Sequence, residues 1–189
     1  MIETQYGLIF KQIREQKMLP LSFFEKVGIR KSCISKFERG ISKMSFEKIY
    51  VMLEAMDVSL EDYELFLNHF SPTFLEEFFS ELEKAELHQE KNKLQAFYKE
   101  AIGNSDFFLA LIVKSKLTSL STEDTQRILT YLMSTRYWTF LELSLLQAIL
   151  DTLTLEDSKK IYYVFEDKTH VYRGIFKYTR KIYQIAYHF

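Results

Sequence analysis

The sequence predicts an all-α protein, and three features of its 189 residues support this. It contains only 5 Gly and 2 Pro, too few for the many turns of an all-β fold. Hydrophobic residues make up 47% and charged residues 27% of the chain, the balance of a folded globular protein. Apolar side chains recur at helical spacing along most of its length. We expect two domains, residues 1–68 and residues 69–189.

Five short helices are expected in the first 68 residues. Pro20 suits the first turn of the second helix, and Gly28 suits its left-handed C-cap. Ser59 and Asp62 have the spacing of a capping box at the start of the fifth helix. The expected bounds are residues 4–16, 21–27, 31–39, 46–56 and 60–68.

The N-terminal region is basic although the whole chain has a formal charge of −1. Residues 1–50 carry ten Lys or Arg and five Asp or Glu, which gives +5, while residues 51–189 carry fifteen and twenty-one, which gives −6. A basic region next to an acidic one favours a polyanionic partner. The second and third helices, joined by a Gly-containing turn, have the arrangement of a helix-turn-helix. A plain helical hairpin with a basic surface would show the same pattern.

Two runs of residues resemble a known family. They are Tyr6-Gly7-x-x-Phe10-x-x-Ile13-Arg14 and Ile34-Ser35-Lys36-Phe37-Glu38-Arg39-Gly40. They resemble the Cro/C1-type (XRE) helix-turn-helix, and more closely the Rgg/GadR/MutR regulators of Gram-positive bacteria. A downstream segment, residues 131–143, is also similar to that family. The resemblance implies a lambda-repressor-like domain followed by a TPR-like superhelix that binds a short peptide pheromone. Without it, helical periodicity would leave a simple helical bundle open.

The resemblance and the exposed positions of the third helix together give the candidate DNA-binding residues. They are Arg14, Ser22, Arg30, Lys31, Ser32, Cys33, Lys36, Arg39 and Lys43. Arg14 has a second interpretation, a structural ion pair with Glu38 that joins the first helix to the third. Two positions depart from the family, because Arg30 stands where relatives have a capping Ser and Cys33 where many have Gln. The bidentate adenine contact of Gln is therefore absent, and the operator sequence cannot be inferred.

The second domain is expected to consist of stacked antiparallel helix pairs. Ser71-Pro72 predicts the start of its first helix. Further helices are expected at residues 91–102, 105–117, 122–135, 138–150, 155–167 and 171–189. Candidate peptide-binding residues are Arg127, Arg136, Tyr137 and Trp138, with a core position as the alternative for Trp138.

The last predicted helix, residues 171–189, has an unusually wide apolar face. At 100° per residue its apolar side chains fill an arc of about 200°, roughly twice the stripe that one neighbour covers. Family members are longer than this chain, so the second domain is expected to be incomplete. We therefore expect a homodimer through this helix. Its candidate contact residues are Ile175, Phe176, Ile182, Tyr183 and Phe189.

Other function classes find little support in the sequence. No Gly-rich phosphate loop, catalytic triad or Cys/His cluster with metal-ligand spacing is visible, so we expect no enzyme, cofactor or metal. The N-terminus does not resemble a signal peptide and no apolar run approaches a membrane span, which predicts a cytoplasmic protein. The predicted function is a dimeric DNA-binding transcription regulator gated by a peptide. The alternatives are a ligand-independent or interfering DNA-binding protein and a helical interaction scaffold.

Overall fold

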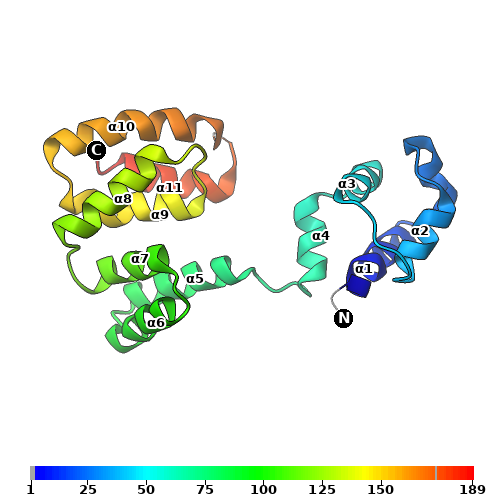
Figure 1. Cartoon of the computed structure of the whole chain (residues 1–189), viewed down its shortest axis with the longest axis horizontal. Helices are drawn as coiled ribbons and strands as arrows, with labels where there is room; N and C mark the ends of the chain where they lie inside the picture. Colours follow the sequence, from blue (N-terminus) through cyan, green and yellow to red (C-terminus); the bar gives the residue numbers. More distant parts are fainter. Residues whose placement is uncertain (1–2, 173) are drawn as a thin grey trace. The chain divides into compact units, whose positions relative to one another are not determined.

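The computed structural model describes residues 3–172 and 174–189, and every regular element in that part of the chain is a helix (Figure 1). The all-α prediction is therefore confirmed. The chain divides into two compact units, Met1–Phe78 and Phe79–Phe189. This division falls within a helix, ten residues after the domain boundary expected at 68/69. Within the described residues, no helix combines the length and the apolar character needed to cross a membrane.

Within its described residues, the first unit contains four complete α-helices, one 3₁₀ helix, the start of a further α-helix and one aromatic core. The helices are α1 (Glu3–Gln16), η1 (Leu21–Val27), α2 (Lys31–Glu38), α3 (Phe46–Ala55) and α4 (Leu60–Leu67). Phe10 is fully buried, and its ring centroid lies 5.6 Å from that of Phe24 and 5.9 Å from that of Phe37. These contacts join α1, η1 and α2, so the core fixes the two helices that flank the turn at Gly28. Gly28 has φ +76°, as its C-cap position requires.

The second helix is a 3₁₀ helix, whereas an ordinary helix was expected. Leu21, Phe24 and Val27 are spaced by three residues, which places them on one face at three residues per turn. Phe24 is buried, and Leu21 and Val27 pack against the same core. The apolar spacing of this segment therefore matches the tighter helix.

Gly7 marks a close approach of α1 to α2. A Cβ built on Gly7 would lie 2.0 Å from the carbonyl oxygen of Phe37. Only a residue without a side chain fits there, because backbone atoms cannot move aside as a flexible side chain can. The same helix interface holds the Arg14–Glu38 pair described below.

The helix α5 (Phe74–Leu87) begins later than expected. Ser71-Pro72 does not start it. Instead the Thr73 hydroxyl accepts a hydrogen bond from the backbone N–H of Glu76, and the Glu76 carboxylate accepts from the Thr73 N–H at 3.0 Å. This is a capping box. The sequence Thr-x-x-Glu at residues 73–76 indicates the helix start, but the prediction used the Ser-Pro pattern instead.

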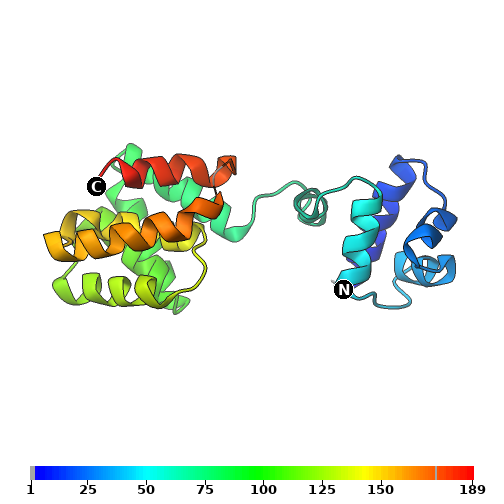
Figure 2. The ribbon, with the colours of Figure 1, turned by 90° about the horizontal axis from the view of Figure 1, so that it is seen from above.

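The second unit contains the remainder of α5 and a stack of helices joined by short turns (Figure 2). The helices are α6 (Lys91–Gly103), α7 (Phe107–Leu117), α8 (Thr122–Ser134), α9 (Phe140–Ile149), η2 (Leu150–Thr152), α10 (Leu155–Thr169), η3 (His170–Tyr172) and α11 (Phe176–Ala186). Within this helical-repeat domain, α7 contacts α6 and α9, and α9 contacts α8 and α11. Consecutive buried residues in α7 (109–113) and α9 (142–146) show that these two helices are central.

The C-terminal segment is not one continuous helix, and the prediction for residues 171–189 is wrong in this respect. The chain forms η3, bends at Gly174 with φ +92°, and begins α11 only at Phe176. Phe189 lies beyond α11, and its ring packs 5.2 Å from Tyr162 and 5.7 Å from Phe165. The wide apolar arc drawn on an unbroken helix is therefore divided, and α10 covers part of it.

Candidate nucleic-acid interface

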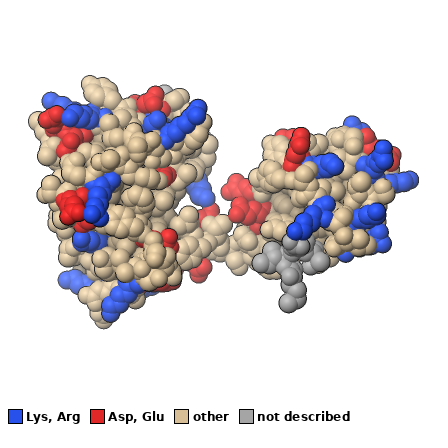
Figure 3. Space-filling view, viewed as in Figure 1, with Lys and Arg blue, Asp and Glu red and all other residues tan. Residues whose placement is uncertain are grey.

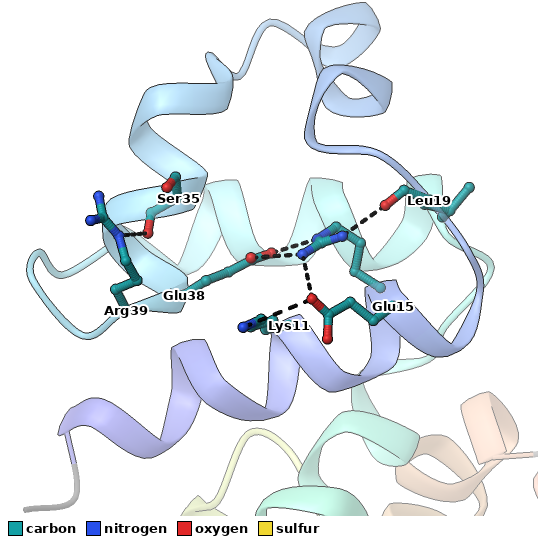
Figure 4. Close-up of polar contacts among 7 residues, drawn as sticks. Lys11, Glu15, Leu19, Ser35, Glu38 and Arg39 are labelled. Carbon is teal, nitrogen blue, oxygen red and sulfur yellow. Dashed lines mark hydrogen bonds and ion pairs between the residues drawn. The ribbon is translucent and has the colours of Figure 1, made fainter.

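A buried ion pair connects α1 to α2 (Figure 4). The Arg14 guanidinium donates from Nε to Glu38 Oε1 at 2.6 Å and from a terminal nitrogen to Glu38 Oε2 at 2.8 Å. A third hydrogen bond, 2.8 Å long, reaches the carbonyl oxygen of Leu19. The hydrogen bond to Glu38 raises the pKa of Arg14. The bidentate geometry and full set of partners make this a structural pair.

Arg14 therefore does not contribute to a DNA-binding surface. Arg14 is 8% exposed and Glu38 is 7% exposed. The sequence left open whether Arg14 contacts DNA or serves the fold, and the structure places it in the fold. The expected DNA contact of Arg14 is corrected on this ground.

The other candidate DNA-binding residues are exposed. They lie on η1, at the start of α2, on α2 itself and in the segment that follows it: Ser22, Arg30, Lys31, Ser32, Cys33, Lys36, Arg39 and Lys43. Figure 3 shows Lys and Arg side chains gathered over the part of the first unit that contains η1 and α2. The buried face of α2 consists of Ile34, Phe37 and Glu38. Burial of that face is what turns the polar and basic side chains outward.

The N-terminus of α2 adds hydrogen-bond donors to this surface. Arg30 occupies the N-cap in extended conformation and its side chain makes no capping hydrogen bond, and the first turn contains no acidic residue. Unpaired backbone N–H groups and the positive end of the helix dipole favour a phosphate at such a position. At the other end of the helix, Arg39 Nε donates to the carbonyl oxygen of Ser35 at 3.0 Å.

Sequence reasoning did not include Lys26 among the basic residues of this region. Its ammonium lies 3.6 Å from the centroid of the Phe23 ring, and the side chain is exposed on η1. A Lys one turn after a half-buried aromatic residue carries no distinctive sequence signal. Its position follows from the 3₁₀ geometry, which the sequence did not predict.

The four candidate peptide-binding residues have different surroundings. Trp138 is fully buried, and its indole N–H donates to the carbonyl oxygen of Leu132 at 3.2 Å, so it serves as a core anchor. Arg127 pairs with Glu123 on the surface of α8. Arg136 lies over the ring of Tyr137, which is 70% exposed. Within the described residues, we find no direct contact between Arg127 and the Arg136–Tyr137 pair.

A charge cluster that the sequence did not reveal lies elsewhere in the second unit. Glu83 of α5 pairs with Arg180 of α11 at 2.7 Å, and Glu86 of α5 pairs with Lys116 of α7 at 2.8 Å. Lys181 lies beside these pairs, and burial is the main cause that lowers its pKa to about 8. The neighbouring Lys116 and Arg180 lower it further, while Glu83 and Glu86 oppose the shift. Three helices far apart in sequence build this cluster.

Comparison with known proteins identifies the class of the first unit. Residues 10–63 match the family model described as Helix-turn-helix. This segment runs from α1 into α4 and includes the turn at Gly28 and the exposed surface of α2. It is a helix-turn-helix domain, as the sequence predicted.

Solved structures share the fold of the chain. The SHP pheromone receptor Rgg2 of Streptococcus dysgalactiae matches in two crystal structures, with TM-scores of 0.71 and 0.68, each at 20% identity over 86% of this chain. A candidate transcriptional regulator from Listeria monocytogenes EGD-e matches with a TM-score of 0.78 at 17% identity over 96% of this chain. This chain spans 60% of the Rgg2 chains and 66% of the Listeria chain. The predicted resemblance to Rgg-type regulators is thus confirmed in the fold, a helix-turn-helix domain followed by a helical-repeat domain.

Proposed function

We propose that the protein is a DNA-binding transcription regulator of the Rgg kind, and that α2 is its recognition helix. The observation that carries this proposal is the exposed basic surface of α2 and its flanks within a segment that matches the helix-turn-helix family. A recognition helix needs one face fixed in a core and the other face free to enter the major groove. Ile34 and Phe37 hold the first face, while Lys31, Ser32 and Lys36 lie on the second.

The basic side chains set the expected binding behaviour. Lys31, Lys36 and Arg30 supply charge for phosphate contacts, which make affinity strongly dependent on salt. Ser32 and Cys33 are small side chains on the exposed face, where base edges would be read. Arg14 supports this surface indirectly, since its pair with Glu38 sets the position of α2 against α1.

Fluorescence anisotropy with a labelled 30-base-pair duplex of random sequence tests the proposal. Lys31→Ala and Lys36→Ala should each weaken binding and reduce the slope of log K against log salt by about 0.9. Lys160→Ala is the matched control, because Lys160 is an exposed Lys on α10 that pairs with Glu156 at 2.6 Å. Equal affinity and equal slope for all four proteins would contradict the assignment of α2.

Two finer features belong to the same proposal. Because the fold is that of a protein described as a pheromone receptor, we propose that the helical-repeat domain binds a short peptide that regulates DNA binding. We also propose that the protein acts as a homodimer. Phe176 and Tyr183 lie on one face of α11, Tyr187 is its C-cap, and the three residues are 92%, 70% and 91% exposed. Exposed aromatic patches are typical of interfaces.

The homodimer has its own test. Of the expected contact residues, Phe176, Tyr183 and Ile175 remain exposed, whereas Ile182 is half-buried and Phe189 packs on α10. Phe176→Glu with Tyr183→Glu should convert dimers to monomers in light scattering. A wild-type protein that stays monomeric without aggregating at tens of micromolar would contradict this part of the proposal.

A further inference from the structure

The cluster at α5, α7 and α11 carries more positive than negative charge. Lys116, Arg180 and Lys181 supply three cations, and Glu83 and Glu86 supply two carboxylates. Each carboxylate is already engaged, Glu83 with Arg180 and Glu86 with Lys116. One positive charge therefore lacks a counter-charge within the cluster.

Lys181 is the cation without a counter-charge. Within the described part of the chain it forms no ion pair, and its ammonium lies 5.2 Å from the centroid of the Phe140 ring. The side chain is half-buried, and this burial is the main cause that lowers its pKa to about 8. Glu83 and Glu86 favour the charge of Lys181 from a distance, but a partly desolvated ammonium that forms no ion pair of its own is unfavourable. A ligand carboxylate at this position would supply the counter-charge that Lys181 lacks.

Apolar surface adjoins the charge. The Phe140 ring meets that of Phe79 in an edge contact, with 5.1 Å between centroids. A ligand that reaches Lys181 with a carboxylate would therefore meet aromatic surface beside it. This combination of cations and aromatic rings suits the end of a peptide better than a fully polar anion.

We propose that Lys116, Arg180 and Lys181 form a binding subsite for the carboxylate of a short peptide, and that Glu83 and Glu86 compete with this carboxylate. The inference rests on the proposed peptide regulation of the protein and names the subsite for it. Lys181 receives the carboxylate directly. Lys116 and Arg180 strengthen binding when they leave their glutamates and pair with the carboxylate of the peptide.

The exchange is easiest at Arg180, because its pair with Glu83 is weak. The Arg180–Glu83 pair is solvent-exposed, with side chains 71% and 61% accessible, and such pairs contribute little to stability. Both glutamates lie on α5, the helix that follows the helix-turn-helix domain in the chain. A bound carboxylate would therefore break the ion pairs that join α5 to α7 and α11, while Leu82 and Ala85 remain buried.

NMR spectroscopy of the full chain with ¹³Cε-labelled lysine tests the subsite. The Lys181 signal is assigned by its absence from the spectrum of Lys181→Arg. The probes are N-acetyl-Ala-Leu-Leu with a free carboxylate, the same peptide as its C-terminal amide, and acetate, all at pH 7 and constant ionic strength. We expect a saturable shift of the Lys181 signal with the free peptide, and binding at least tenfold weaker for the amide and for acetate.

Variants of the competing glutamates sharpen the test. Glu83→Gln combined with Glu86→Gln should tighten binding of the free peptide several-fold, and Lys116→Met should weaken it. Glu156→Gln is the control, because Glu156 forms an exposed pair on α10 outside the cluster. The fluorescence of Trp138, the chain's single tryptophan, reports whether each variant keeps the fold of the second unit.

Four results would overturn the inference. Three of them are equal shifts from the free peptide and its amide, the absence of a saturable shift, and an affinity that Glu83→Gln and Glu86→Gln leave unchanged. Acetate that binds as tightly as the peptide would show a site for a free small carboxylate and would also overturn it. None of these results bears on DNA binding by α2, which the salt-dependence measurement tests separately.

Discussion

The two units stabilise their helices in different ways. In the first unit a buried bidentate ion pair and a backbone contact at Gly7 fix α1 against α2, inside a core of aromatic rings. In the second unit, hydrogen-bonded caps and exposed ion pairs recur along the stack, and α7 and α9 are buried on most faces. The first arrangement holds one surface in one position. The second leaves charged and aromatic side chains exposed on the surface of the stack.

The largest effect is expected from breaking the buried pair. Glu38→Ala leaves the Arg14 guanidinium buried without its carboxylate, and removal of one partner of such a pair typically costs about 3–5 kcal/mol. Hydrogen exchange should show lost protection in α1 and α2. The urea transition of Trp138 fluorescence, which reports on the second unit, should not change. Equal loss in both units would contradict the comparison.

A slightly smaller effect is expected at Gly7. Gly7→Ala brings a Cβ to 2.0 Å from the Phe37 carbonyl oxygen, so α1 and α2 must separate. We expect a loss of about 3 kcal/mol in the free energy of unfolding of the first unit. Gly103→Ala is the matched control, because nothing lies within 4 Å of a Cβ at that position. The control should be neutral or stabilising by up to about 1 kcal/mol.

The caps of the two units should differ by a smaller amount. Ser59 and Asp62 form an exposed capping box at α4, and Ser59→Ala should cost about 0.5–1 kcal/mol. At α9 the Thr139 hydroxyl and N–H donate to the buried carboxylate of Glu142, which also accepts from Tyr131 at 2.7 Å. Thr139→Ala should cost about 2 kcal/mol. Chemical denaturation of both variants gives the comparison, and a larger loss for Ser59→Ala would contradict it.

Acid should weaken the second unit through Glu142. Burial alone would raise the pKa of Glu142, but hydrogen bonds from Thr139 and Tyr131 outweigh it, so its pKa lies below the usual value. A lowered pKa stabilises the fold above the unfolded value of about 4.3. This contribution is lost as the pH falls through the lower folded value. Glu142→Gln should therefore flatten the acid side of the stability profile measured by Trp138 fluorescence, and an unchanged profile would contradict this role.

Elements that depend on local sequence signals were predicted best. Local signals such as Gly28, the Ser59/Asp62 box and the spacing of Ile34 and Phe37 predicted the elements and the exposed face of α2. The start of α5 at the Thr73 cap was missed because the competing pattern Ser71-Pro72 received more weight. The 3₁₀ geometry of η1 was missed because its signal, the spacing of Leu21, Phe24 and Val27 by three residues, was not used.

Long-range contacts set the remaining limits. The C-terminal helix was predicted as continuous because the pattern of residues 171–189 is helical throughout, while the chain bends at Gly174. Lys116 and Lys181 are ordinary lysines in the sequence. They come close to each other and to the glutamates only when α7 and α11 pack near α5. Burial of Trp138 likewise depends on the packing of the whole repeat domain. Periodicity carries no information about which distant charges meet.

Cys33 offers the most direct measurement of the central claim, that α2 forms the DNA-contacting surface. It is the chain's single cysteine, and it is exposed on α2. The rate of its alkylation by N-ethylmaleimide is measured without DNA and with duplex at a concentration that saturates anisotropy. The control is Cys33→Ser combined with Lys160→Cys, which places the thiol on α10. The account predicts that DNA slows alkylation of Cys33 at least tenfold and leaves the control unchanged. Equal alkylation of Cys33 in the free and fully bound protein would contradict it.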